Sequence, residues 1–340
     1  MIDQVLKNLN ILVTGADGFI GSHLCEKLVH NGAKVKALVA YNSFNKSGWL
    51  DDLPIDIQKE IEIVSGDIRD SDFVESISKD ANLIFHLAAL ISIPYSYQAP
   101  RSYVDTNVIG TLNILQSARK YECQRIISTS TSEVYGSAQK IPIDETHILQ
   151  AQSPYAASKI AADHILESFV KSFEVPAIIL RPFNTYGPRQ SERAVISSII
   201  RQVLDDNCAS IKVGDLSTKR DFNYIDDTVN AFIKLGSVDS KSIEYGTAYN
   251  SGSGKAVTIK ETLEKIIKLS NTKKEIEQEA IRFRPKNSEV NHLIASSTKL
   301  CKLTGWKPEV DLTEGLKRTI AWWDERNNKN KLRNFSDYVV

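Results

Sequence analysis

Tyr155 and Lys159 lie four residues apart in the segment SPYAASK, a spacing that places both side chains on one face of a helix. A lysine ammonium beside a phenol favours the phenolate, so it lowers the pKa of the tyrosine from about 10 towards neutral pH. A tyrosine in this state can act as a base. Taken alone, such a pair is more often a surface contact, and the segments that precede it in the chain decide between the two interpretations.

The segment STSTSEVYG at 128–136 places hydroxyl groups and one carboxylate, that of Glu133, at the end of an apolar run. The run begins as RIIS at 125–128 and is typical of a buried strand. Because a strand normally closes on turn residues, the polar cluster is either a plain loop or the edge of an active site.

The segment TGADGFIGSHL follows the first apolar run and places Gly15, Gly18 and Gly21 in a GxxGxxG spacing that opens a helix. Glycines permit a tight turn and a close approach of the backbone, and the helix N-terminus offers free N–H groups to a pyrophosphate. This context favours a dinucleotide site over a structural turn. In the later segment GDIRD, Asp67 and Ile68 could border an adenine, although Asp67 could equally be a turn or helix-cap carboxylate.

The end of the second apolar run lacks a carboxylate. An acidic residue about 20 positions after the glycines would hold the ribose of NAD, but the residues at 40–42 are Ala, Tyr and Asn. Ser43, Asn45 and Lys46 could instead contact a 2'-phosphate, although no arginine is present to clamp it. Asn42 and Ser43 are expected in the cofactor site. The sequence therefore predicts NAD or NADP as cofactor and slightly favours NADP.

The spacing of apolar residues predicts the elements that carry these groups. Apolar runs typical of buried strands lie at 10–15, 33–40, 61–64, 83–89, 125–130 and 176–182. Helical patterns lie at 20–31, 71–79, 100–121, 154–173, 193–205, 226–236, 258–269 and 311–326. Apolar strands alternating with helices predict an α/β fold with a doubly wound parallel sheet. We expect a dinucleotide-binding domain at 1–183, a smaller mixed α/β substrate lobe at 184–330 with some segments returning to the first domain, and a tail at 331–340.

The composition excludes several classes of protein. Lysine plus arginine equals aspartate plus glutamate at 42 each in 340 residues, so no net field would attract nucleic acid or an anionic membrane. No apolar stretch approaches the roughly 20 residues that span a bilayer, and the first residues do not resemble a signal peptide, so we expect a cytoplasmic protein. The four cysteines form no CxxC pair, and neither a metal site nor a disulfide is predicted.

Together, the GxxGxxG loop, the hydroxyl-rich strand end and the YxxxK pair resemble the extended short-chain dehydrogenase/reductase family over about 10–325. Within it, STSEVYG and SPYAASK look most like the nucleotide-sugar 4,6-dehydratases, which are lyases. HLAALISIPYSYQAP, TSTSEVYG and RPFNTYGPRQ are most similar to the 4,6-dehydratases of the legionaminic-acid pathway, which act on nucleotide-linked N-acetylglucosamine, generally the GDP form.

The resemblance implies roles for particular residues and an assembly. It assigns catalysis to Thr131, Glu133, Tyr155 and Lys159. It adds Phe19, Ile20, Leu87, Ala88 and Ala89 to the cofactor site, which also includes Tyr155 and Lys159. It places Ser132, Asn184, Arg189 and Arg220 at the nucleotide sugar, with a surface or interdomain ion pair as the alternative for each arginine. It also implies a homodimer through the helices at 100–121 and 154–173, with apolar residues such as Leu112, Leu115, Ile165 and Phe169 available for burial.

The implied reaction is a dehydration without net oxidation. Tyr155 and Thr131 act on the sugar 4-hydroxyl while the nicotinamide takes the C4 hydride, Glu133 removes the C5 proton, water leaves C6, and the hydride returns to C6. The dTDP-glucose dehydratases carry an acidic residue where this chain has Ser132, whose hydroxyl is too weak an acid to replace it. We therefore hypothesise that Glu133 serves as base and then as acid. The alternatives are a UDP-glucuronate decarboxylase, a 4-epimerase and a non-catalytic nucleotide-binding regulator.

Overall fold

The central feature of the fold is a seven-stranded parallel sheet with the strand order β10-β6-β5-β4-β1-β2-β3. The computed structural model describes residues 4–288, 290 and 292–329, so the expected tail at 331–340 lies outside the described residues. The strands of this sheet are β1 (Asn10–Thr14), β2 (Lys34–Ala40), β3 (Ile61–Gly66), β4 (Leu83–His86), β5 (Arg125–Thr129), β6 (Ala177–Pro182) and β10 (Ala248–Ser251). The predicted doubly wound parallel sheet is confirmed.

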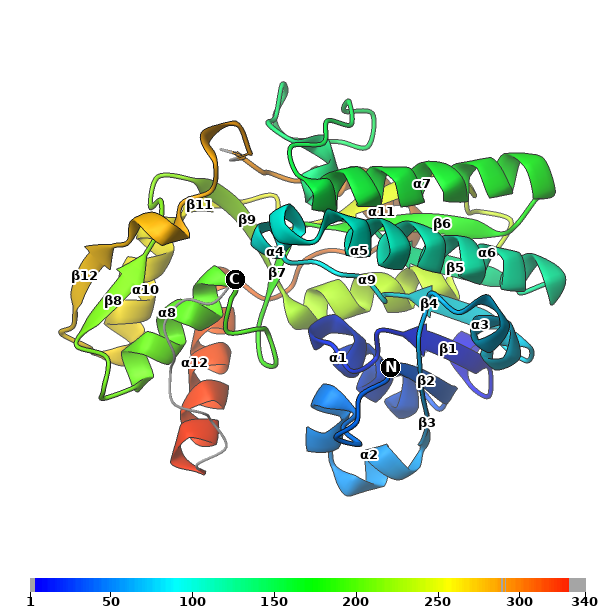
Figure 1. The fold of residues 1–340 in the computed structure, drawn as a ribbon, viewed down its shortest axis with the longest axis horizontal. Coiled ribbons are helices and arrows are strands. Elements are labelled where there is room, and N and C mark those ends of the chain that lie inside the picture. The colour runs from blue at the N-terminus through cyan, green and yellow to red at the C-terminus, as the bar shows by residue number, and fades with distance from the viewer. Residues whose placement is uncertain (1–3, 289, 291, 330–340) are drawn as a thin grey trace.

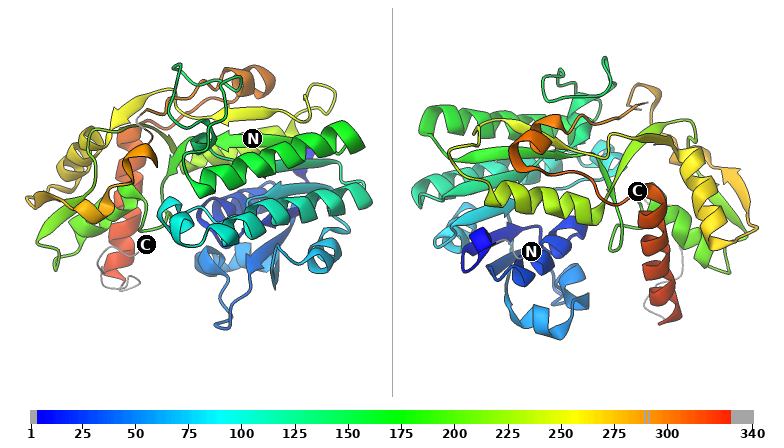
Figure 2. Two further views of the ribbon diagram at one scale, coloured as in Figure 1. Left: turned by 45° about the horizontal axis from the view of Figure 1, so that its top comes forward. Right: turned by 180° about the vertical axis from the view of Figure 1, so that it is seen from behind.

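Helices cover both faces of this sheet. The α-helices among the described residues are α1 (Phe19–His30), α2 (Ile55–Lys59), α3 (Ser71–Ser78), α4 (Ile93–Gln98), α5 (Pro100–Tyr103), α6 (Gly110–Lys120), α7 (Pro154–Phe173), α8 (Val195–Leu204), α9 (Ile225–Ser237), α10 (Ile259–Ser270), α11 (Thr298–Thr304) and α12 (Leu312–Asn328). Of these, α8, α10 and α12 pack against one another. Figures 1 and 2 show α6 and α7 side by side on one face, with α9 on the opposite face. This is the arrangement that near-continuous apolar strands require.

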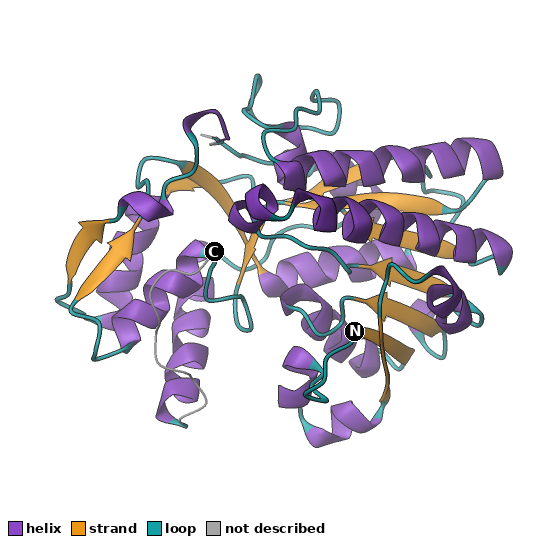
Figure 3. Cartoon of the chain, in the orientation of Figure 1, coloured by secondary structure: helices purple, strands orange, loops and turns teal. Residues whose placement is uncertain are grey.

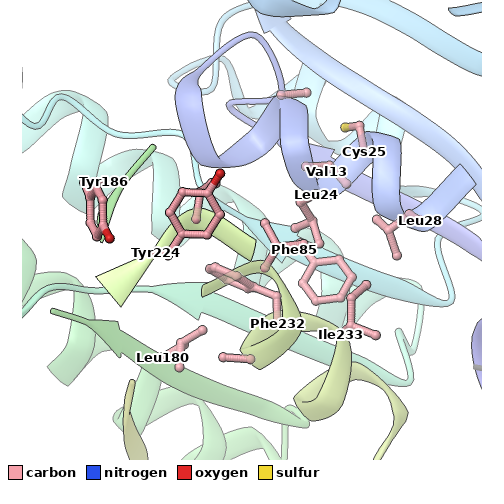
Figure 4. Close-up of a cluster of buried hydrophobic side chains, with 14 of the residues drawn as sticks. Val13, Leu24, Cys25, Leu28, Phe85, Leu180, Tyr186, Tyr224, Phe232 and Ile233 are labelled. Atoms are coloured by element: carbon pink, nitrogen blue, oxygen red, sulfur yellow. The ribbon is translucent and has the colours of Figure 1, made fainter. Parts of the chain in front are cut away.

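Alternation along each strand divides the core between the two faces. Ile11 and Val13 of β1 belong to the hydrophobic cluster under α1 and α9, whereas Leu12 packs with α3, α6 and α7. Figure 4 shows the first cluster, in which the rings of Phe85 and Phe232 meet edge to face with centroids 6.0 Å apart. Because both faces of the sheet are buried, the register between its strands is fixed. The positions of the carboxyl ends of the strands are fixed with it.

The helix that carries the Tyr–Lys pair begins where the sequence predicts. The Ser153 hydroxyl accepts a hydrogen bond from the Ala156 amide at 3.1 Å, and Pro154 occupies the first helical turn. The helix expected at 100–121 is instead divided into α5, a π-helical turn at Val104–Ile109, and α6. Within that turn the Asn107 side chain bonds both backbone groups of Leu90, which fixes the loop after β4.

Two further small sheets lie beyond β6. β7 (Asn184–Tyr186), β9 (Lys219–Tyr224) and β11 (Ala256–Thr258) form a three-stranded mixed sheet, and β8 (Ser210–Val213) pairs with β12 (Glu275–Gln278). Figure 3 shows the β8–β12 pair beside α8 and α10, away from the central sheet. The chain returns between these segments to add β10 to the central sheet. Among the described residues, no helix combines the length and apolarity that crossing a membrane requires.

One residue that we expected at an interface with a partner subunit is instead buried within its own chain. Leu115 is fully buried in the chain's own core under α6, so it is not available for an interface. Ile165 and Phe169 are partly buried against the same cluster. The spacing of apolar residues indicated an apolar face on this helix. The central sheet of the same chain, and not a second copy of the protein, covers the part of that face around Leu115.

Candidate active site

A cavity of about 960 Å³ runs along the carboxyl ends of the central strands. Ligands of doubly wound sheets bind at this edge. Its walls include most of the residues expected to bind a cofactor: Gly15, Gly18, Phe19, Ile20, Gly21, Asp67, Ile68, Leu87, Ala88, Ala89, Tyr155 and Lys159. The order of strands places the β2 and β3 ends, with Asp67, at one side of β1 and the β5 end at the other.

The glycine loop at the start of α1 fits a closely bound backbone. Gly15 has φ +68°, and a Cβ there would lie 2.8 Å from the Ala88 amide nitrogen. A Cβ on Gly21 would lie 2.2 Å from the Gly15 carbonyl oxygen. A side chain at position 15 would clash with the backbone that follows β4, and one at position 21 would clash with the glycine loop itself, so the observed loop requires glycine at both positions.

Asn42 and Ser43 do not line the cavity in this structure. The Asn42 amide donates to the carbonyl groups of Ala40 (3.2 Å) and Lys46 (2.7 Å), and its oxygen accepts from two amides of the same loop. The side chain therefore closes the loop after β2. In the sequence, this loop offered the nearest polar side chains in place of the carboxylate that is missing at 40–42. In the structure, hydrogen bonds within the loop hold the Asn42 side chain against the loop's own backbone.

Asp67 lines the cavity and also forms the turn after β3. Its carboxylate accepts hydrogen bonds from the Arg69 backbone amide and from Arg69 Nε, both at 2.9 Å. The hydrogen bond from Arg69 is the main reason why the pKa of Asp67 is lowered. Asp70, not Asp67, caps α3 by accepting from the Phe73 amide at 3.0 Å. Asp67 thus forms the turn that the sequence allows, and its contact with an adenine stays a prediction.

Tyr155, Thr131 and Lys159 meet where α7 passes the end of β5. The Tyr155 hydroxyl and the Thr131 side chain share a hydrogen bond, and Lys159 is 3% exposed. Burial raises the pKa of Tyr155 above its ordinary value, and the Thr131 hydrogen bond only partly opposes this. Burial also lowers the pKa of Lys159. We expected Lys159 to lower the pKa of Tyr155, but burial dominates and shifts this pKa upwards instead.

Glu133 lies in the same corner as Tyr155. The short 3₁₀ turn Ser132–Tyr135 places it there, because the Thr131 hydroxyl caps the turn by accepting from the Glu133 amide at 3.2 Å. The negative charge of Glu133 is close enough to contribute to the raised pKa of Tyr155. Arg284 approaches from the second part of the chain, with Nη1 3.6 Å from Glu133 Oε1. Sequence reasoning missed Arg284, since the charged segment around it has no spacing that relates it to position 133.

The residues expected at the nucleotide sugar are spread over several elements. Ser132 is buried within the turn, and Asn184 opens β7 with a buried side-chain nitrogen that has no hydrogen-bond partner among the described residues. Arg220, in β9, donates from Nη1 to the Lys219 carbonyl at 3.1 Å. Arg189 forms an ion pair with Glu26 of α1 at 2.7 Å, which is the interdomain alternative; its contact with a diphosphate stays a prediction.

The cavity residues fit a nicotinamide dinucleotide. The glycine loop leaves room for a pyrophosphate beside α1, and Thr129 Oγ1 at the end of β5 is buried with no partner among the described residues. His86 is not available as a further ligand, since its ring nitrogens contact the hydroxyls of Thr14 (2.8 Å) and Thr111 (3.1 Å). Across the described ranges, no group of three His, Cys, Asp or Glu side chains could hold a metal ion.

Comparisons with known proteins agree with this geometry. The family model described as GDP-mannose 4,6 dehydratase matches residues 12–319. A protein of Methanocaldococcus jannaschii, provisionally named UDP-glucose 4-epimerase, is 36% identical over 324 residues, which are 93% of this chain and 99% of that protein.

Two solved structures show the same fold across nearly the whole chain. The UDP-glucose 4-epimerase of Thermotoga maritima, solved with UDP-glucose, has a TM-score of 0.84 at 30% identity, covering 94% of this chain and 100% of that chain. The dTDP-glucose 4,6-dehydratase of Bacillus anthracis, in complex with NAD, has a TM-score of 0.81 at 28% identity, covering 94% and 98%. The chain therefore belongs to the GDP-mannose 4,6 dehydratase family of extended short-chain dehydrogenase/reductases, which makes it an enzyme of the sugar dehydratase and epimerase type.

Proposed function

We propose that this enzyme is a nucleotide-sugar 4,6-dehydratase that retains and regenerates its nicotinamide cofactor. The proposal depends mainly on one observation: the Glu133 carboxylate lies close to Tyr155 and Thr131. Oxidation at C4 needs a base for the hydroxyl proton, and elimination across C5 and C6 needs a second one. A carboxylate beside the Tyr–Thr pair supplies that second base.

In the proposed reaction, each of four side chains moves a proton, holds an atom of the substrate or stabilises a charge. A bound nicotinamide would take the hydride from C4, return it to C6 and, while oxidised, add a positive charge that favours the tyrosinate. Tyr155 removes the proton of the 4-hydroxyl, and Thr131 holds the same oxygen. Glu133 removes the C5 proton, which the 4-ketone has made acidic, and delivers it to the departing C6 hydroxyl as water. When the hydride is returned to C6, Glu133 adds a proton taken from solvent to C5, and Tyr155 releases to solvent the proton that it took from the 4-hydroxyl. The buried Lys159 supports the charge on Tyr155.

The proposed substrate is a nucleoside-diphosphate N-acetylglucosamine, with GDP as the nucleotide. The resemblance of HLAALISIPYSYQAP and RPFNTYGPRQ to dehydratases of the legionaminic-acid pathway supports this choice. The orphaned amide nitrogen of Asn184 offers a donor to such a ligand. Ser132, Arg189 and Arg220 stay proposed contacts of the nucleotide sugar.

A 4-epimerase is the second candidate. The 36% identity to the M. jannaschii protein and the fold match to the T. maritima epimerase favour it. Both reactions need Tyr155 and Thr131, but 4-epimerisation leaves the C5 proton in place and needs no base to remove it. The two candidates therefore differ in whether Glu133 takes part in the reaction.

Incubation of the purified enzyme with GDP- and UDP-linked N-acetylglucosamine, followed by mass spectrometry, tests the proposal. Loss of one water from the GDP sugar supports the dehydratase and its substrate, and loss from the UDP sugar alone supports the reaction with a different nucleotide. An unchanged mass with an altered sugar configuration would instead identify an epimerase. Loss of carbon dioxide from UDP-glucuronate would identify a decarboxylase, and binding without turnover would identify a regulator.

A further inference from the structure

The carboxylate of Asp17 reaches the end of β2 from the glycine loop. Its Oδ2 accepts a hydrogen bond from the amide of Ala40, the last residue of β2, at 3.3 Å. Both residues line the cavity. A Rossmann fold usually presents an acidic residue of the second strand at this place, where it binds the 2'-hydroxyl of the adenosine ribose. Here the charge comes from a different element of the same cavity.

The loop after β2 holds Asp17 in place. The Trp49 amide donates to the Asp17 carbonyl at 3.1 Å. Gly48 has φ +60°, and a Cβ on it would lie 2.4 Å from that carbonyl oxygen and 2.8 Å from Asp17 Cβ. The chain can pass this close to Asp17 because position 48 has no side chain. The carboxylate is therefore positioned by two segments before any ligand binds.

Asp17 has unused hydrogen-bonding capacity. Burial raises the pKa of its carboxyl group, and the amides of Ala40 and of Asp17 itself only partly offset this. A carboxylate has two oxygens that can accept about four hydrogen bonds. Among the described residues, no lysine or arginine forms an ion pair with Asp17. Arg69, which also lines the cavity, donates to Asp67 from Nε at 2.9 and 3.0 Å.

We propose that Asp17 accepts a hydrogen bond from the 2'-hydroxyl of the adenosine ribose and selects NAD over NADP. A 2'-phosphate at this position would meet a half-buried carboxylate, which repels it, whereas a hydroxyl supplies the donor that the carboxylate lacks. The inference reverses the slight preference for NADP drawn from the residues at 40–42. It rests on the cofactor part of the proposed function and is independent of the sugar chemistry.

Titration calorimetry of the full chain, freed of copurified nucleotide, tests the selection without any sugar substrate. The wild type should bind NAD⁺ more tightly than NADP⁺. Asp17→Asn keeps the shape but removes the charge, so it should weaken NAD⁺ binding by about tenfold and strengthen NADP⁺ binding by about tenfold. Asp70→Asn removes the same charge from the same cavity wall but keeps the cap of α3, so the ratio of the two dissociation constants should change by less than about threefold.

Three outcomes would overturn the inference. The wild type could bind NADP⁺ more tightly, a result that needs no variant to fold. Asp17→Asn, folded by circular dichroism, could keep the wild-type ratio of dissociation constants. Asp70→Asn could change that ratio as much as Asp17→Asn, which would show a general charge effect. Failure to bind either dinucleotide would reject the cofactor part of the proposed function as well, whereas a wrong preference with intact dehydration would reject the role of Asp17 alone.

Discussion

The guanidinium of Arg181 lies 2.9 Å from the carboxylate of Asp163, and both side chains are only 3% exposed. Asp163 follows Lys159 by one turn of α7, and its negative charge partly offsets the effect of burial on the pKa of Lys159. The Ser130 hydroxyl, on the cavity wall, also donates to Asp163 at 2.8 Å. The pair thus joins β6 to α7, the helix that carries Tyr155 and Lys159.

Replacing Asp163 by asparagine should strongly destabilise the fold. The variant keeps an acceptor for Ser130 but leaves the Arg181 charge buried without its anion, and breaking a buried pair in this way costs roughly 3–5 kcal/mol. Urea unfolding followed by circular dichroism measures the loss. Glu167→Gln makes the same chemical change at a partly exposed position of the same helix, where the carboxylate contacts the exposed His164, and should cost less than about 0.5 kcal/mol. Equal losses in the two variants would contradict the role given to the pair.

The elements of the central sheet could be predicted because local patterns determine them. The apolar runs of β1 to β6 mark strands buried on two faces, and the Ser153–Pro154 pair marks the start of α7. β9 and β12 escaped prediction because their sequences KRDFNY and EIEQ are mostly polar and lack an apolar run. They form strands because tertiary partners pair with them.

The residues of the candidate site also fall into two groups: those that local sequence patterns predict and those that only the folded chain brings together. The glycine loop and the Tyr155–Lys159 pair have fixed spacings, so the sequence places them without knowledge of the fold. The positions of Asp17 at the end of β2 and of Arg284 beside Glu133 depend on contacts between segments far apart in the chain. The raised pKa of Tyr155 was missed for a related reason, since burial is a property of the packed structure.

His86 should make the protein sensitive to mild acid. Burial lowers the pKa of His86 to about 3, against 6.5 for an unperturbed histidine, so the unfolded chain binds a proton that the folded chain excludes. Stability is present above pH 6.5 and falls as the pH drops towards 3. Between pH 6 and 5 the free energy of unfolding should fall by about 1 kcal/mol per pH unit because of His86.

Denaturant titrations of His86→Gln at pH 5 and pH 6 check this prediction. The glutamine cannot take up a proton, so the variant should lose this part of the pH dependence even if its stability at neutral pH is lower. His164→Gln is the control for removing a histidine, because this side chain is 59% exposed and is not part of the buried core around His86. An unaltered dependence in His86→Gln would assign the acid sensitivity to other groups.

The enzyme should be a homodimer that pairs through the helical face at 100–121 and 154–173. Val104 and Ile109, beside α6, are 46% and 38% exposed, and Phe173 at the end of α7 is 43% exposed. Light scattering at micromolar concentration should give the mass of two chains, and Ile109→Asp should shift it to one, since an interface cannot bury an unpaired charge. Phe44→Asp, which changes a more exposed ring in the loop after β2, should remain dimeric. A single-chain mass for the wild type would refute the dimer.

Glu133→Gln should separate the two halves of the reaction. Glutamine keeps the size and hydrogen-bonding capacity of the side chain but cannot take up a proton, so C4 oxidation should proceed while elimination stalls. Reduced cofactor should then accumulate on mixing with substrate, visible as nicotinamide absorbance, and solvent deuterium should not enter C5.

Tyr155→Phe provides the opposite case on the same substrate. Without its hydroxyl, the first proton transfer fails and the hydrogen bond to Thr131 is lost, so little reduced cofactor should form. The contrast matters because a general disturbance of the pocket would suppress both steps in both variants. Normal turnover of Glu133→Gln with full incorporation of deuterium at C5 would assign the second base to another residue. Normal turnover without such incorporation would remove C5 from the reaction and leave the epimerase as the better description.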